Sequence, residues 1–302
     1  EKNIQNSQIR KLSKKLKRLI VRPMHGLGNR LRVISSAYVI AKKSKRDLVI
    51  CWDKDEHFNA EFHDLFKEQN FDVNISFVNS GFLENIHEIS FYQYLENEPY
   101  THKNKEINLD TDLDILIFSS CAIVSKFSNY EEENKFLKSL KLSNNVEKII
   151  NTLNISSNHI GVHIRYDGDD WESLPHEDIK HWNVDAHEII RKNRNKSKPE
   201  FFLKRMNELI KKNDKASFFI SAANLSSIEF LLKNLKKNKI QFVSRPKDSN
   251  KRNVSSLEYA LADILLLSKC EYILGSGWSS FTECAQRFSS HNQVIEIAGE
   301  DF

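Results

Sequence analysis

The sequence predicts an α/β protein with two Rossmann-like domains that face a cleft. Short apolar runs alternate with stretches of helical periodicity in both halves of the chain. Such alternation is typical of a parallel sheet covered by helices on both faces. The length of 302 residues also exceeds one ordinary core and suits two domains. The predicted division is a basic N-terminal leader at 1–17, a first domain at 18–155 and a second domain at 156–302.

The alternation assigns an element to most of the chain. In the first half it predicts a strand at 19–21, a turn at 25–29, a helix at 29–43, strands at 48–52 and 113–118, and helices at 131–140 and 145–153. The rest of 60–130 looks irregular. In the second half it predicts strands at 158–164, 216–221, 240–244, 271–275 and 293–297, and helices at 199–212, 225–236, 256–268 and 279–288.

Composition and charge exclude several classes of protein. With 40% hydrophobic and 28% charged residues, and few Gly or Pro, the chain is globular rather than disordered or fibrous. The net charge of +4 comes from the first 20 residues, which hold seven Lys and Arg against one Glu. The remainder is slightly acidic, so we expect no nucleic-acid partner.

The four cysteines are scattered, with no CxxC pair and no His at metal-ligand spacing. We therefore expect reduced, buried thiols rather than a metal site. No apolar stretch reaches the length of a membrane span, and no signal peptide is visible. The sequence thus predicts a cytoplasmic protein that contacts a membrane, if at all, through the basic leader. Because the chain does not start with Met, an anchor or a further module has room outside it.

The segment Gly161–Arg165 closes an apolar run and is the most informative part of the sequence. His163 and Arg165 lie two residues apart on a strand, so they point the same way at its carboxyl end, where ligands bind in open α/β sheets. The guanidinium of Arg165 can hold a phosphate by two charge-assisted hydrogen bonds. Carboxylates that could take a proton follow at once: Asp167, Asp169 and Asp170. In the alternative interpretation, Arg165 pairs with one of these carboxylates and only fixes the turn.

Gly26 and Gly28 form a glycine turn between the first strand and the first helix. They resemble the start of a dinucleotide-binding fingerprint, with Asp53 placed to serve a ribose, but the third glycine position holds Leu31. We favour a turn at which the backbone approaches a ligand, and an ordinary tight turn is the alternative. Polar side chains follow it at the helix N-terminus: Asn29, Arg30 and Arg32.

Two further segments of the second half carry candidate binding groups. Ser279 or Ser280 can cap the helix that follows the strand at 271–275, and the free N–H groups of a helix start bind anions. A plain N-cap is the alternative. Asp263 lies on the buried stripe of an apolar helix and needs a partner. It could accept from the N1 and N2 donors of a guanine, or pair with an arginine such as Arg252.

Taken together, these segments resemble the superfamily that contains the alpha-1,2-, alpha-1,6- and protein O-fucosyltransferases, including the rhizobial nodulation fucosyltransferase. Gly161–Arg165 resembles its HxR motif, and Ser276–Glu283 resembles its late Ser/Thr-rich motif. Asp263–Ser268 resembles its DIxxLS-like helix, and His25–Arg30 resembles its N-terminal GLGN turn. The order and spacing cover about residues 18–297.

The resemblance implies the GT-B fold, with a nucleotide sugar bound mainly by the second domain. Arg165 would stabilise the leaving diphosphate, helped by the backbone N–H groups of three residues: Ser279, Ser280 and Phe281. His163 and Asp263 would read the nucleotide, which is guanine in the fucosyl members. Gly26, Gly28, Asn29 and Arg30 would lie at the same site. Such enzymes are inverting and metal-independent, so we expect neither a metal nor a cofactor.

The chain departs from the alpha-1,6 pattern HxRRxDK directly after the HxR motif. Tyr166 replaces the second Arg, and Gly168 stands where the pattern has Asp. The general base is therefore not fixed by position. Asp169 is the first candidate, with Asp167 and Asp170 as rivals.

The sequence thus predicts a fucosyltransferase-like glycosyltransferase whose partners are a nucleotide-sugar donor and a glycan or protein acceptor. GDP-fucose is the first choice of donor, with GDP- or UDP-linked xylose or rhamnose as alternatives. We expect 60–130 and the Trp171–Trp182 loop to shape the acceptor site. Two rival hypotheses remain. An NAD(P)-dependent oxidoreductase would use the glycine turn, and a non-catalytic nucleotide- or sugar-binding module would form no product.

Overall fold

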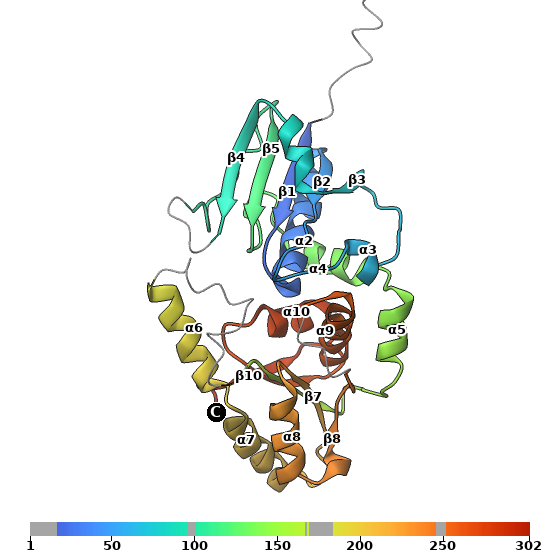
Figure 1. Cartoon of the computed structure of the whole chain (residues 1–302), viewed down its shortest axis with the longest axis vertical. Coiled ribbons are helices and arrows are strands. Elements are labelled where there is room, and N and C mark those ends of the chain that lie inside the picture. Colours follow the sequence, from blue (N-terminus) through green and yellow to red (C-terminus); the bar gives the residue numbers. More distant parts are fainter. Residues whose placement is uncertain (1–16, 96–100, 167, 169–183, 246–251) are drawn as a thin grey trace, which may run out of the picture.

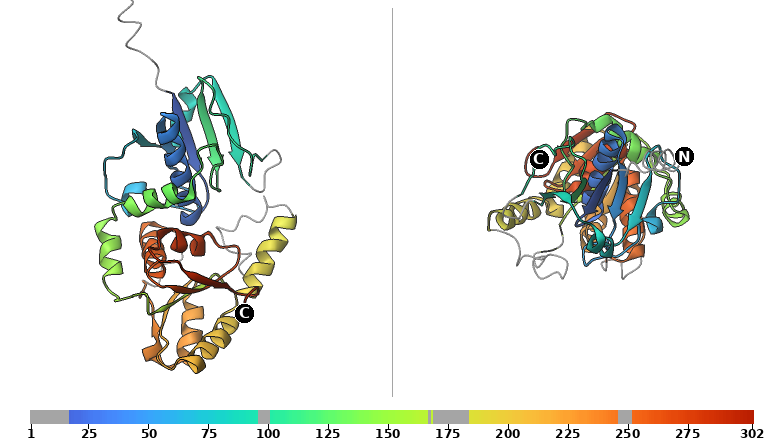
Figure 2. Two further views of the ribbon diagram at one scale, coloured as in Figure 1. Left: turned by 180° about the vertical axis from the view of Figure 1, so that it is seen from behind. Right: turned by 90° about the horizontal axis from the view of Figure 1, so that it is seen from above.

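A computed structural model describes residues 17–95, 101–166, 168, 184–245 and 252–302. Within these residues the chain forms two five-stranded sheets, and every pairing between their strands is parallel. Figure 1 shows one sheet in the upper half of the molecule and the other in the lower half, and Figure 2 shows the same arrangement from behind. In the part of the chain that the structure describes, no helix is both long and apolar enough to cross a membrane.

The first sheet has the strand order β3-β2-β1-β5-β4. Its strands are β1 (Arg18–Pro23), β2 (Asp47–Cys51), β3 (Ile75–Val78), β4 (Ile89–Tyr94) and β5 (Asp114–Ser119). The accompanying helices are α2 (Leu27–Ser44), α3 (Phe62–Leu65), α4 (Tyr130–Ser139), α5 (Asn144–Ile150) and a short 3-10 helix at Ser80–Asn85. The central strands are apolar and buried, as a sheet covered on both faces requires.

The second sheet has the order β10-β9-β6-β7-β8, so β6 lies at its centre. Its strands are β6 (Ile160–Ile164), β7 (Phe218–Ala222), β8 (Ile240–Gln241), β9 (Tyr272–Gly275) and β10 (Val294–Ile297). The helices are α6 (Val184–Lys196), α7 (Pro199–Lys212), α8 (Leu225–Asn234), α9 (Val254–Leu267), α10 (Ser280–Phe288) and a 3-10 turn at Lys237–Lys239.

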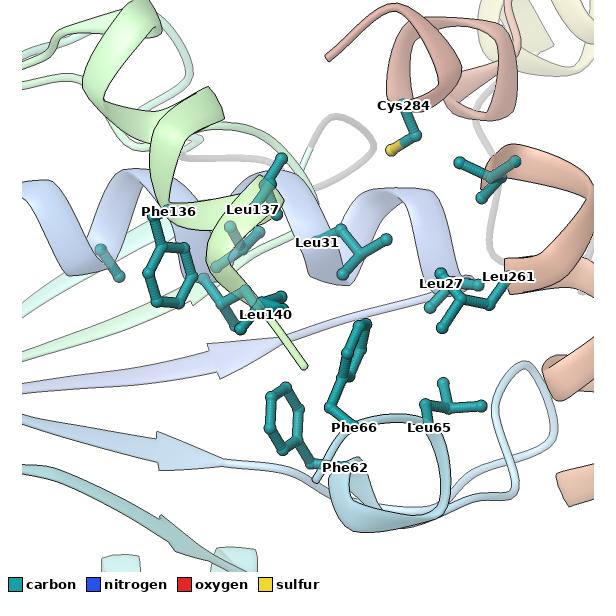
Figure 3. Close-up of a cluster of buried hydrophobic side chains, with 14 of the residues drawn as sticks. Leu27, Leu31, Phe62, Leu65, Phe66, Phe136, Leu137, Leu140, Leu261 and Cys284 are labelled. Atoms are coloured by element: carbon teal, nitrogen blue, oxygen red, sulfur yellow. The ribbon is translucent and has the colours of Figure 1, made fainter. Parts of the chain in front are cut away.

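The two halves share a continuous apolar core. Helices α9 and α10 of the second half lie between the two sheets and pack against α2, α3, α4 and α5 of the first half. One cluster of buried side chains therefore runs from β1 and α2 through to α9 and α10. Figure 3 shows Leu27 and Leu31 of α2 in this cluster together with Leu261 of α9 and Cys284 of α10.

Arg287 of α10 joins the halves by polar contacts as well. Its side chain is 1% exposed and donates to Glu133 Oε2 at 2.7 Å and Asn134 Oδ1 at 2.8 Å, both on α4, and to Ser35 Oγ at 3.0 Å on α2. Burial raises the pKa of Glu133, and the neighbouring Arg287 opposes that rise. Near it, Arg32 of α2 pairs with Glu283 of α10 at 3.2 Å.

All four cysteines are free and buried. Burial raises the pKa of Cys51 to about 11 and those of Cys270 and Cys284 to about 12. Cys284 lies at the junction of the halves, where its Sγ donates to the carbonyl oxygen of Gly28 at 3.5 Å. The thiols are thus packed into the interior rather than presented to solvent.

The structure confirms the α/β class and most of the predicted elements. It differs at the edges of the sheets. The sequence prediction missed β3 and β4, which lie in the stretch expected to be irregular, and it missed α6. The strand predicted at 240–244 is only two residues long.

Candidate active site

The carboxyl end of β6 carries His163 and Arg165. The His163 ring is 3% exposed, and its Nδ1 lies 2.9 Å from Thr282 Oγ1 on α10. The ring also stacks on Phe281, with the centroids 4.8 Å apart and the planes inclined by 17°. His163 is therefore held in one orientation against the first turn of α10.

Ser276 ties the loop between β9 and α10 to the end of β6. Its Oγ accepts from the backbone N–H of Arg165 at 2.8 Å and donates to the carbonyl oxygen of His163 at 3.0 Å. Ser276 is 1% exposed, so both bonds are shielded from water. The half-buried Arg165 and the start of α10 consequently lie close together at the carboxyl end of the second sheet.

Ser279 is the N-cap of α10, as predicted, and its Oγ accepts from the backbone N–H of Phe281 at 3.3 Å. The helix macrodipole places partial positive charge at this end. The N–H of Phe281, which the resemblance assigns to the leaving diphosphate, is used here by the cap. Ser280 is the first residue of the helix and lies against the first half of the chain.

Asp263 lies on α9 and is 1% exposed. Its Oδ2 accepts from Ser221 Oγ on β7 at 2.8 Å and from the guanidinium of Arg245. The pairing with an arginine that the sequence left open is therefore present, but the partner is Arg245, in the segment after β8, rather than the suggested Arg252. Among the described residues nothing donates to Asp263 Oδ1. Burial raises the pKa of Asp263, while Arg245 and Ser221 lower it.

The glycine turn lies against α10. A Cβ added to Gly28 would come 2.6 Å from Ser280 Oγ and 2.9 Å from the Ser280 carbonyl oxygen. At Gly26 the nearest atom, Arg252 Nη1, would be 3.6 Å away. The absence of a side chain at Gly28 therefore allows the start of α10 to pack closely against the turn. The group that approaches Gly28 is Ser280 of this chain rather than a ligand.

Arg30 is fully buried behind the glycine turn. Its guanidinium donates to the His25 carbonyl oxygen at 2.8 Å, the Asp53 carbonyl oxygen at 2.7 Å and Asp55 Oδ2 at 2.8 Å. Burial lowers the pKa of Arg30 to about 10, against the opposing effect of Asp55. Arg30 thus holds the loops that follow β1 and β2. Asn29 lies beside it, and its Oδ1 accepts from Arg32 at 3.0 Å.

Two histidines that the sequence analysis did not single out form a pair at this end of the first sheet. The rings of His25 and His57 are 5.3 Å apart and nearly perpendicular. His25 has φ 63, a left-handed conformation that is uncommon outside glycine. Burial first, and the neighbouring His57 second, lower the pKa of His25 to about 4. The only signal of this backbone conformation in the sequence is Gly26, which directly follows His25 in the turn.

Of the stretch that follows Arg165, Tyr166 and Gly168 are described, and Gly168 has φ 103. The candidate bases Asp167, Asp169 and Asp170, and the Trp171–Trp182 loop, lie outside the described residues. Within the described ranges, no group of three or more His, Cys, Asp or Glu side chains could hold a metal ion.

Known proteins resemble this chain in structure and not in sequence. No family model and no curated protein matches the sequence. The structure matches the NodZ alpha-1,6-fucosyltransferase soaked with GDP-fucose with a TM-score of 0.58 and 18% identity, over 90% of this chain and 93% of that one. It matches POFUT1 in complex with GDP-fucose with a TM-score of 0.57 and 13% identity, over 95% of this chain and 99% of that one.

The chain has the GT-B fold of these fucosyltransferases. A second NodZ structure, from Bradyrhizobium, gives the same TM-score of 0.58 at 18% identity, over 90% of this chain and 94% of that one. The GT-B fold explains the two Rossmann-like halves and the position of β6 at the centre of the second sheet. The predicted fold and the resemblance to GT-B fucosyltransferases are thereby confirmed over nearly the whole chain.

Proposed function

We propose that the chain is an inverting glycosyltransferase that transfers a sugar, fucose in the first instance, from a GDP sugar to an acceptor hydroxyl. The GT-B fold, shared with structures solved with GDP-fucose, supports the donor class. The same geometry suits GDP- or UDP-linked xylose or rhamnose, and the experiment below separates these donors.

One observation carries the proposal: Ser276 binds the backbone on both sides of Ile164 and so places Arg165 beside the start of α10. A guanidinium and a helix N-terminus are both complementary to a diphosphate. Because the backbone of Arg165 and the helix start are held before the ligand arrives, both groups are available to stabilise negative charge that develops during the reaction. Fixed positive charge of this kind serves the role that a divalent cation has in other transferases.

The reaction then follows a single displacement. A carboxylate takes the proton of the acceptor hydroxyl, and the oxygen forms a bond to the anomeric carbon from the face opposite the diphosphate. The bond between that carbon and the phosphate oxygen breaks, and its electron pair leaves with the nucleoside diphosphate. Arg165 stabilises the leaving charge. Asp169 is our first candidate for the base, with Asp167 and Asp170 as alternatives.

Asp263 supports guanine as the base of the donor. Its Oδ1 is buried and lacks a donor among the described residues, while Ser221 and Arg245 hold Oδ2. A buried carboxylate oxygen of this kind calls for an N–H partner. Guanine can supply this partner from N1–H or N2–H, and the comparison of GDP with UDP below tests the choice. His163 of β6 is the register partner of Ser221 on the neighbouring strand β7, so the two side chains lie on the same side of the sheet.

Asp53 argues against the rival oxidoreductase. One of its carboxylate oxygens accepts from Arg22 at 2.7 Å, and the other accepts from the Ser80 N–H at 2.7 Å. A ribose would have to compete with both contacts. The glycine turn is also occupied by Ser280, so we propose no dinucleotide site there.

The test is Arg165→Ala, which we expect to lower turnover about 100-fold or more because the leaving charge loses its main partner. Arg191→Ala, at an exposed position on α6, is the matched control and should keep full activity. Product release from GDP-fucose, UDP-xylose and the other candidate donors is measured with and without EDTA. Near-normal turnover in Arg165→Ala would refute the proposal.

Thermal unfolding with GDP, UDP and NAD separates the three hypotheses. A ligand that binds only the native state raises the melting temperature. We expect stabilisation by GDP that survives EDTA and is reduced in Arg165→Ala. Stabilisation by NAD alone would support the oxidoreductase, and GDP binding without any product would support a binding module.

A further inference from the structure

Trp278 combines exposure with an unusual backbone. It lies in the loop between β9 and α10, its side chain is 52% exposed, and its φ is 54. A positive φ is a genuine outlier for a bulky residue. The structure records no hydrogen bond or ring contact of Trp278 with any described residue. No hydrogen bond or ring stacking among the described residues therefore accounts for the positive φ and the exposure of this ring.

The loop around Trp278 is nevertheless fixed. Ser276, two residues before it, is bonded to the backbone of β6, and Ser280, two residues after it, lies against Gly28. A Cβ added to Gly277 would come 2.6 Å from Asn193 Oδ1 on α6, so the loop also packs closely on that helix. The indole is thus presented from a rigid support. Its Cα lies within about 7 Å of that of Ser276.

Trp278 lies on the opposite side of β6 from the nucleoside-reading groups. Asp263 bonds to Ser221 of β7 and to Arg245 after β8, whereas Trp278 follows β9. In the sheet order β9-β6-β7-β8, Arg165 at the end of β6 lies between them. A nucleotide sugar placed with its base at Asp263 and its diphosphate at Arg165 directs its sugar toward the β9 side. The acceptor must approach there.

On this basis, which rests on the function proposed above, we propose that Trp278 is a platform for a pyranose ring of the acceptor. The acceptor is then a glycan rather than a protein side chain. One face of a pyranose carries C–H groups with partial positive charge, and the indole face is negative and apolar. A flat, exposed and rigidly held indole binds such a face without having to be ordered first.

The first test observes the indole directly. The four tryptophan indole N–H signals are recorded in 15N-labelled protein saturated with GDP, and Trp278→Phe identifies the signal of Trp278. Methyl glycosides of glucose, galactose, mannose and N-acetylglucosamine are then added, with a Ser/Thr peptide as the control. We expect at least one glycoside to shift the Trp278 signal selectively. If no glycoside shifts it, or only the peptide does, the proposal is overturned.

The second test uses the glycoside that shifts the signal as the acceptor. Trp278→Asn removes the ring, and Asn tolerates the left-handed backbone, so the variant should fold. We expect its acceptor KM to rise about tenfold or more, and Trp278→Phe to restore most of the loss. Weaker stabilisation by GDP in Trp278→Asn would instead assign the ring to the donor base and overturn the proposal. Failure of GDP to stabilise the wild-type protein would refute the proposed function itself.

Discussion

His25 combines an unusual backbone conformation with a lowered side-chain pKa, so it makes the stability of the fold depend on pH. It holds φ 63 at the end of β1, and its ring packs against His57. Burial lowers its pKa to about 4. The folded protein thus keeps His25 neutral under conditions in which the unfolded chain, with a pKa near 6.5, binds a proton.

This difference predicts a loss of stability in mild acid. Between pH 6.5 and 4 the unfolded state binds more protons at His25, so stability falls as the pH falls through this window. From pH 7 to pH 5 the loss attributable to His25 is roughly 2 kcal/mol. His25→Asn keeps a residue that tolerates the left-handed backbone and removes the titration. Urea unfolding at both pH values should show that the variant loses about 2 kcal/mol less than the wild type.

His291→Asn is the matched control, because it removes a partly exposed histidine at the surface. The control should follow the wild-type pH dependence more closely than His25→Asn does. Equal loss of stability in the wild type and in His25→Asn would show that His25 titrates in the folded protein as it does in the unfolded chain.

At the scale of elements, the contact between the glycine turn and the start of α10 gives a second prediction. Gly28→Ala places a Cβ 2.6 to 2.9 Å from atoms of Ser280, so one of the two elements must move. We expect a loss of about 1 to 3 kcal/mol. Gly26→Ala, whose nearest neighbour would lie at 3.6 Å, creates no clash and should lose only about 0.5 kcal/mol from its place as the N-cap of α2. The urea midpoints of the two variants measure these losses of stability. Equal losses would contradict the explanation that a Cβ at position 28 clashes with Ser280.

Continuous burial explains why the central strands could be predicted, although the sequence also predicted the partly exposed edge strand β10. The interiors of β1, β6 and β7 are mainly apolar and buried because helices cover both faces of these strands. The missed strands β3 and β4 are both at the edges of the first sheet, and most of their residues are only partly buried. The two-residue β8 is likewise an edge strand. Helix α6 has few apolar residues and so leaves no clear stripe in the sequence.

The site divides in the same way. His163, Arg165 and the Ser279 cap could be predicted because their positions follow from strand alternation and from the start of a helix. The partner of Asp263 could not, since Arg245 reaches it only when β8 lies next to β7. The contact between Ser280 and Gly28 could not be predicted from local sequence patterns either, because it joins segments about 250 residues apart.

At the scale of the whole molecule, Arg287 and Glu133 form a buried ion pair between the two halves. Removing one partner leaves a buried charge without compensation. We expect Arg287→Leu or Glu133→Leu to cost about 3 to 5 kcal/mol each. The double variant should lose much less than the sum, since neither charge then remains. Urea unfolding of the four proteins gives the coupling.

Glu131→Gln provides the control for this cycle. Glu131 pairs with Lys135 on the same helix α4, but both side chains are largely exposed. An exposed pair contributes little, so this variant should unfold much like the wild type. Strictly additive losses at Arg287 and Glu133 would show that the two charges act independently.

The burial of the thiols makes their reactivity a measure of how the protein opens. A thiol reacts as its thiolate, and a pKa of about 12 leaves almost none of that form while Cys284 stays packed. Its Sγ points at Gly28 across the junction, so a thiol reagent reaches Cys284 when the two halves part or when α10 unfolds. Cys270, beside the second sheet, becomes reactive only when that half opens. Modification of Cys284 ahead of Cys270 would therefore indicate that the halves separate before the second half unfolds.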